Sequence, residues 1–194
     1  MNKKQRTGLY FGTFNPIHIG HLAIANYIKI FGNLNEIWFV ISPQSPFKKH
    51  QSISDDRDRL EMVFLAIDGV PGYRASDIEF NMPKPSYTID TVIYLKEKYP
   101  ERRFSLIMGA DNLQNLHKWK NCTELLSQCP VLVYPRPGFS NQNSNIAGDI
   151  TVIDAPLMEI SSSFIRQSIA NKHDVRFFLP NRVWQYIDDR QLYK

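Results

Sequence analysis

The sequence predicts an α/β fold built on a Rossmann-like, doubly wound parallel sheet. Short apolar runs alternate with single stretches of helical periodicity, which is the pattern of successive strand–helix–strand units. The run 37–41 is apolar without interruption, as expected for a strand buried on both faces of a parallel sheet. A length of 194 residues is enough for one ordinary core, so we expect a single domain over residues 1–194.

Each expected element is bounded by residues that interrupt its pattern. Apolar runs predict strands at 9–11, 37–41, 73–78, 104–108, 131–134 and 150–153. A period of 3.6 residues predicts helices at 19–31, 55–68, 88–99, 161–171 and 180–189, with shorter ones opening at Asp111 and spanning 122–129. Gly32, Gly69 and Pro100 end the first three helices. Ser54 is the expected N-cap of the second helix, and the proline-rich stretch 81–85 is expected to be irregular.

Charge and composition exclude several classes of protein. The chain has 23 basic and 19 acidic side chains, and a net charge of +4 is too small for a polycation that coats nucleic acid. No apolar run approaches the roughly 20 residues that cross a bilayer, and the N-terminus does not resemble a signal peptide. Cys122 and Cys129 lack the spacing of a metal site, and such sparse cysteine fits a reducing cytoplasm. We therefore expect a cytoplasmic protein with no nucleic-acid or membrane partner; a homo-oligomer stays open.

Ligands of doubly wound sheets bind beyond the carboxyl ends of the strands, so the strand-to-helix turns are the places to search. The turn 12–21 carries His18 and His21, three residues apart at a helix N-terminus, where backbone N–H groups favour anions. Gly20 between them is expected to let a ligand approach closely. The pair therefore predicts a phosphate site. Surface histidines are the plain alternative, and zinc is disfavoured because no third ligand is near.

A second candidate anion site lies near the C-terminus, at 160–166. Ser161, Ser162 and Ser163 open a helix, where their hydroxyl and N–H groups can bind an anion. Arg166 lies one turn further on the same face and adds a guanidinium. The alternative is an ordinary serine cap followed by a solvated arginine.

Together the two segments resemble the HxGH and SSxxIR motifs of the nucleotidylyltransferase superfamily and, within it, the bacterial nicotinate-nucleotide adenylyltransferases. Further segments match in order along nearly the whole chain: 43–48, 59–62, 86–91, 107–111 followed by Trp119, 136–138 and 179–193. The resemblance implies the nucleotidylyltransferase type of fold. It also implies transfer of the adenylyl group of ATP to nicotinate mononucleotide, giving deamido-NAD and pyrophosphate in NAD biosynthesis.

The resemblance also implies roles for single residues. It implies that His18, His21 and Arg166 act on the triphosphate as catalytic residues. The implied ATP site contains these three together with Gly12, Thr13, Phe14, Lys48, Gly109, Asp111, Ser162 and Ser163. The implied site for the pyridine substrate contains Asn15, Thr88, Trp119 and Lys120. Magnesium is expected to arrive with ATP, and we expect no protein cluster of metal ligands.

Three positions depart from the family pattern. Asn15 stands where many members have Asp, Phe47 replaces a His, and Lys120 follows the tryptophan where many members have Tyr. Lys120 is interpreted equally well as attracting a carboxylate or as a solvated side chain.

Related functions share parts of this sequence pattern. An adenylyltransferase that prefers nicotinamide mononucleotide, or uses both pyridines, is the main alternative, and an inactive nucleotide-binding sensor is a remote one. Phosphopantetheine adenylyltransferases usually carry TxGH, and cytidylyltransferases carry a different C-terminal motif, so both are disfavoured.

Overall fold

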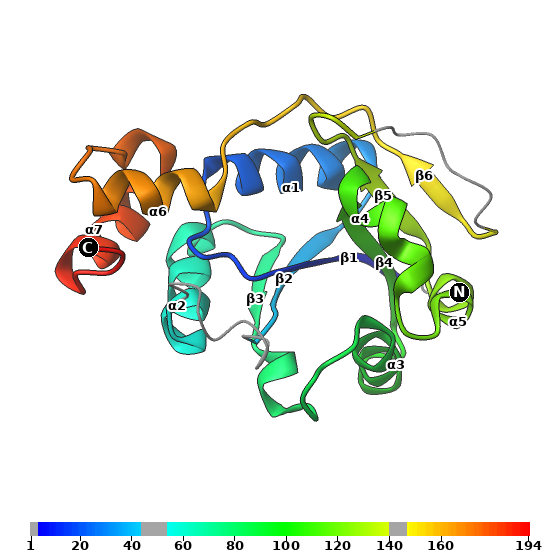
Figure 1. Ribbon diagram of the computed structural model, residues 1–194. Coiled ribbons are helices and arrows are strands. Elements are labelled where there is room, and N and C mark those ends of the chain that lie inside the picture. Colours follow the sequence, from blue (N-terminus) through cyan, green and yellow to red (C-terminus); the bar gives the residue numbers. More distant parts are fainter. Residues whose placement is uncertain (1–3, 44–53, 140–146) are drawn as a thin grey trace.

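The computed structural model describes residues 4–43, 54–139 and 147–194. Within these ranges six strands form one parallel sheet in the order β3-β2-β1-β4-β5-β6 (Figure 1). The strands are β1 (Gln5–Gly12), β2 (Glu36–Ile41), β3 (Tyr73–Ser76), β4 (Arg102–Gly109), β5 (Val131–Tyr134) and β6 (Ile150–Val152). The order reverses direction between β1 and β4, so the doubly wound parallel sheet expected from the sequence is confirmed.

Helices connect the strands and follow the last of them. They are α1 (Ile19–Phe31), α2 (Asp56–Ile67), α3 (Thr88–Lys98), α4 (Ala110–Asn115), α5 (Cys122–Gln128), α6 (Ser162–Ala170) and α7 (Asn181–Asp189). Short 3-10 helices are η2 (Ile78–Asn81), η3 (Leu116–Lys118) and η4 (Arg176–Phe178). In the described parts of the chain, no helix is long and apolar enough to cross a membrane.

Alternate residues of the strands face two separate hydrophobic clusters. Tyr10 and Phe39 belong to the cluster covered by α1, α2, α6 and α7. Leu9 and Trp38 belong to the cluster covered by α3, α4 and α5. Helix α1 and helix α3 therefore lie on opposite sides of the sheet (Figure 1). Because both faces are covered, the strands are apolar without alternation, as the sequence indicates.

Two expected details of the segments around α2 and β3 are wrong. The N-cap of α2 is Asp55, whose side chain accepts a hydrogen bond from Arg57 N–H at 2.8 Å. Ser54 instead donates its hydroxyl to Asn15 Oδ1 at 2.7 Å. Strand β3 stops at Ser76 and does not reach Ile78, because Asp77 leaves the extended conformation, with φ −92° and ψ 15°, and the chain enters η2.

A buried arginine of α2 joins the ends of β1 and β2. The side chain of Arg59 is fully buried and pairs with Asp56 one turn earlier. Its Nη1 donates to the carbonyl oxygens of Thr13, at 2.6 Å, and Ser42, at 2.9 Å. One side chain therefore satisfies backbone carbonyls of two neighbouring strand-to-helix turns, which would otherwise lack partners in the protein interior.

We predict that Arg59→Met lowers the free energy of unfolding by about 3 kcal/mol, because it removes a charged partner of Asp56 and the donor to two backbone carbonyls. Urea denaturation measures the change. Arg57→Met on the exposed face of α2 is the matched control and should change stability by less than about 0.5 kcal/mol. Equal stability of the two variants would contradict the role given to Arg59.

Candidate active site

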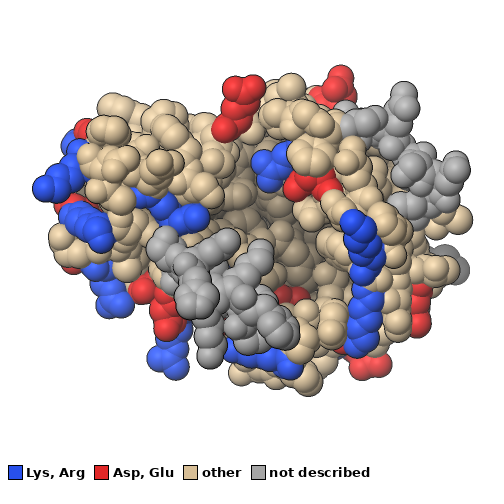
Figure 2. Space-filling model, viewed as in Figure 1, with Lys and Arg blue, Asp and Glu red and all other residues tan. Residues whose placement is uncertain are grey.

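The candidate site lies where the sheet order reverses, at the carboxyl ends of β1 and β4. The segment between β1 and α1 contains the first motif, and α6 contains the second. The space-filling view shows this face hollowed at its centre, between the side built by α6 and the side built by α4 (Figure 2). The two motifs therefore border a concave surface at the position where this class of fold binds ligands.

The two histidines are stacked on each other at the start of α1. His18 is the N-cap residue, with an extended φ of −144°. The rings of His18 and His21 lie 3.8 Å apart, centroid to centroid, with an interplanar angle of 29°. The backbone N–H of His18 donates to Nδ1 of His21 at 3.3 Å. Neutral His21 therefore holds its proton on Nε2, which leaves that N–H as a hydrogen-bond donor.

The two glycines of the motif make room for side chains of the protein itself. A Cβ on Gly20 would lie 3.0 Å from Nδ1 of His18, and a Cβ on Gly12 would lie 2.8 Å from the ring of Phe14. Phe14 is buried, has φ 45°, and meets the His21 ring edge-on at 5.2 Å. Gly20 thus accommodates the His18 ring, and Phe14 supports His21 from within the core. Because the Phe14 ring is buried, a contact of Phe14 with ATP would come from its backbone.

Burial keeps both imidazoles neutral near pH 7. Burial, assisted by the positive charge of Arg136, lowers the pKa of His18 to about 4. Burial and the adjacent His18 hold the pKa of His21 well below its usual range. Without a bound anion the histidines therefore contribute hydrogen-bond donors, and the fixed positive charge comes from arginines.

Side chains of α6 bind the turn that precedes the histidines. Arg166 donates from Nη1 to the carbonyl oxygen of Asn15 at 2.8 Å. Ser162 donates its hydroxyl to the carbonyl oxygen of Pro16 at 2.9 Å, and Ser161 caps α6 by accepting from the N–H of Phe164. Two motifs almost 150 residues apart in the chain are therefore in direct contact. This contact brings Arg166 and the histidines to one edge of the sheet, as the sequence predicts.

Asn15 supports the turn from inside. It is buried, and its Oδ1 accepts hydrogen bonds from Ser54 and, at 2.7 Å, from the hydroxyl of Tyr193. This oxygen therefore joins the turn to the segment before α2 and to the C-terminal part of the chain. Lys48 and Phe47 lie outside the described residues.

An arginine that the sequence motifs did not single out lies in the segment just after β5. Arg136 has its Nε 3.6 Å from Oδ1 of Asp111, and its Nη2 donates to the hydroxyl of Tyr134 at 3.3 Å. A Cβ on Gly109 would lie 2.3 Å from that same carboxylate oxygen and 3.0 Å from Cγ of Arg136. Asp111 and Arg136 thus pack over a glycine backbone. The match at 136–138, directly after a strand, was the available indication.

The residues assigned to a pyridine substrate lie in two other segments. Thr88 is the first residue of α3 and is half-buried, and Trp119 is half-buried against the cluster that α3 covers. Lys120 is not simply solvated, because its Nζ lies 2.9 Å from Oδ2 of Asp90. The same nitrogen lies 4.4 Å from the ring centroid of Tyr87. Lys120 therefore links the two segments.

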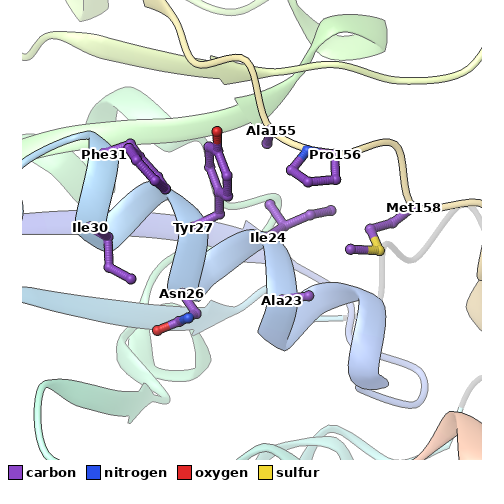
Figure 3. Close-up of a pocket in the computed structure, with 9 residues that line it drawn as sticks. All are labelled: Ala23, Ile24, Asn26, Tyr27, Ile30, Phe31, Ala155, Pro156 and Met158. Atoms are coloured by element: carbon purple, nitrogen blue, oxygen red, sulfur yellow. The ribbon is translucent and has the colours of Figure 1, made fainter.

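Other features of the described chain are separate from this site. Figure 3 shows an apolar cavity of about 350 Å³ that includes Tyr27, Phe31 and Met158, between α1 and the segment before α6. Among the described residues, no three His, Cys, Asp or Glu side chains gather as metal ligands would. Both cysteines are free.

Known proteins match this chain over most of its length. A family model described as cytidylyltransferase-like matches residues 9–168. The curated protein named "Probable nicotinate-nucleotide adenylyltransferase" from Flavobacterium johnsoniae is 49% identical, over 97% of this chain and 99% of the relative. The protein of the same name from Bacteroides fragilis is 48% identical, over 95% of this chain and 92% of the relative. The solved structure of Plasmodium falciparum nicotinic acid mononucleotide adenylyltransferase, complexed with APC, shares the fold, with a TM-score of 0.78, 21% identity and 97% coverage of both chains.

We predict that the stability of the protein rises with pH between about 4 and 6.5. In this range unfolded His18 binds a proton that the folded state does not bind, so protonation favours unfolding. The full shift corresponds to about 3 kcal/mol. Urea denaturation at several pH values should show a weaker dependence in His18→Asn. The exposed His117→Asn is the control, and the hypothesis fails if both variants keep the original slope.

Proposed function

Because the chain belongs to the family of bacterial nicotinate-nucleotide adenylyltransferases, within the cytidylyltransferase-like proteins, we propose that it transfers the adenylyl group of ATP to nicotinate mononucleotide. The products are deamido-NAD and pyrophosphate, and the step belongs to NAD biosynthesis. The observation that carries the proposal is the contact of α6 with the turn that bears His18 and His21, through Arg166 and Ser162.

The reaction needs positioning more than acid or base chemistry. The phosphate of the mononucleotide is already anionic near pH 7, so its oxygen attacks the α-phosphorus of ATP without a general base. A bond forms between that oxygen and the α-phosphorus, and the bond to the bridging oxygen breaks. The electron pair leaves with pyrophosphate. Holding two charged phosphates in line and compensating the charge of the transition state supply the acceleration.

The catalytic residues fit these needs. We assign His18, His21 and Arg166 to the triphosphate and its transition state. Neutral His21 offers Nε2–H, which donates to a phosphate oxygen without introducing the desolvation cost of a buried imidazolium. The bond from Arg166 to the Asn15 carbonyl holds the guanidinium against the turn that precedes the histidines. Arg136 adds a second guanidinium, whose charge acts on both imidazoles.

We propose that most of the remaining contacts with ATP come from residues at the carboxyl ends of β1 and β4. The backbone at Gly12, Thr13 and Phe14 would meet the phosphates, together with Ser162, Ser163 and Lys48. Gly109 and Asp111 would lie beside the adenosine.

Magnesium would enter bound to ATP. The carboxylate of Asp111 pairs with Arg136 at 3.6 Å, and its side chain is 35% exposed, so it would hold a water molecule of a hydrated cation. The ion would neutralise charge on the leaving pyrophosphate.

The pyridine ring is assigned to Thr88 and Trp119, with Trp119 stacking on it. A second acceptor, nicotinamide mononucleotide, differs from the first by one amide in place of one carboxylate. We further propose one domain over residues 1–194, a cytoplasmic location, and small-molecule partners with neither nucleic acid nor membrane.

We predict that His21→Ala lowers kcat by at least about a hundredfold, because it removes a donor to the transition state. Pyrophosphate release measures the rate, and circular dichroism checks the fold. His117→Ala on the exposed surface of η3 should retain the original rate. A near-normal rate in His21→Ala would remove this residue from the mechanism.

We predict that nicotinate mononucleotide is the best acceptor of three. Pyrophosphate release with ATP and magnesium would be compared for nicotinate mononucleotide, nicotinamide mononucleotide and phosphopantetheine. Higher kcat/KM for either of the latter two would replace the proposed substrate. Failure to bind ATP in calorimetry would favour a non-enzymatic role.

A further inference from the structure

An ion pair connects the two segments that carry the proposed pyridine site. Lys120 directly follows Trp119, and Asp90 lies two residues after Thr88 in the first turn of α3. The Nζ of Lys120 donates to Oδ2 of Asp90 at 2.9 Å. The ammonium also lies over the ring of Tyr87, 4.4 Å from its centroid. Both members of the pair therefore lie within two residues of the side chains assigned to the pyridine ring, close enough for their charges to act on it.

The ion pair has no net charge, and removal of either side chain would change the net charge beside the proposed pyridine site. The two side chains are 41% and 43% exposed, so solvent screens their charges without cancelling them at short range. Loss of Lys120 would leave a negative charge beside the site, and loss of Asp90 would leave a positive one. A substrate carboxylate responds to this charge directly, whereas an uncharged amide responds much less.

We propose that Lys120 determines the preference for the acid over the amide by neutralising Asp90, and not by binding the substrate carboxylate itself. This inference rests on the proposed function. A direct contact would make the ammonium shared between Asp90 and the substrate, and the two carboxylates brought close together would repel each other. Lys120 is thus a positioning and charge-compensating residue.

The test compares kcat/KM for nicotinate mononucleotide with that for nicotinamide mononucleotide in four proteins: wild type, Lys120→Gln, Asp90→Asn and the double variant. We expect the acid-to-amide ratio to fall about three- to tenfold in Lys120→Gln and to rise by a similar factor in Asp90→Asn. In the double variant the ratio should return to within about twofold of wild type. The effects should shrink in 0.5 M salt.

Two controls separate charge from structure. Lys118→Gln removes an exposed ammonium from the same segment, where it pairs with the Asn115 side chain, and should leave the ratio unchanged. Melting temperatures report whether the variants fold. If the pair had only a structural role, its loss would lower kcat/KM equally for both acceptors. A change in the ratio therefore indicates an effect of charge on the substrate.

Four results would overturn the inference. A double variant as poor with the acid as Lys120→Gln would indicate direct contact with the substrate. An equal loss for both acceptors in Lys120→Gln would indicate that the pair only holds the two segments together. A wild-type enzyme inactive with both mononucleotides would refute the proposed function as well, whereas an active enzyme with an unchanged ratio would refute this inference alone.

Discussion

The structure depends on how the backbone carbonyls of one turn are satisfied. After β1 the chain leaves the sheet, and the carbonyl oxygens of Thr13, Asn15 and Pro16 accept hydrogen bonds from side chains. Side chains from elsewhere supply the donors, with Arg59 of α2 at the first, Arg166 of α6 at the second, and Ser162 of α6 at the third. An unpaired buried carbonyl would cost about 1–3 kcal/mol, so these bonds fix the turn and, with it, the start of α1. The position of both histidines therefore depends in part on bonds from other elements to the turn before them.

In this arrangement arginines carry the positive charge, and neutral histidines offer uncharged hydrogen-bond donors. Burial keeps His18 and His21 uncharged, and the guanidinium groups come from Arg136, after β5, and from Arg166 in α6. Each arginine is held by oxygen acceptors of the protein, Tyr134 for one and Asn15 for the other. A site that binds two phosphorylated molecules and releases a highly charged product benefits from donors whose geometry is fixed before the ligands arrive.

The sequence predicted the order of elements well because both faces of a parallel sheet must be covered, which leaves long apolar runs. It predicted the meeting of the two motifs because all strand ends gather at one edge. The sequence predictions were wrong where one side chain can form hydrogen bonds with more than one partner. Ser54 is a good N-cap by type, but Asn15 takes its hydroxyl, so Asp55 caps α2. The packing of Phe14 under His21, the position of Arg136 and the pairing of Lys120 with Asp90 all require tertiary contacts that no local pattern encodes.

The hydrogen bond between Tyr193 and Asn15 joins residues 178 positions apart. During synthesis the ribosome delivers the sheet strands and both histidines long before it delivers this tyrosine. Contacts of such long range form late, because the loop that they close costs conformational entropy before the bond rewards it. A nascent chain that has already formed its sheet would therefore still lack one hydrogen bond that supports the turn before the histidines. The active site would be completed only after the sheet has folded.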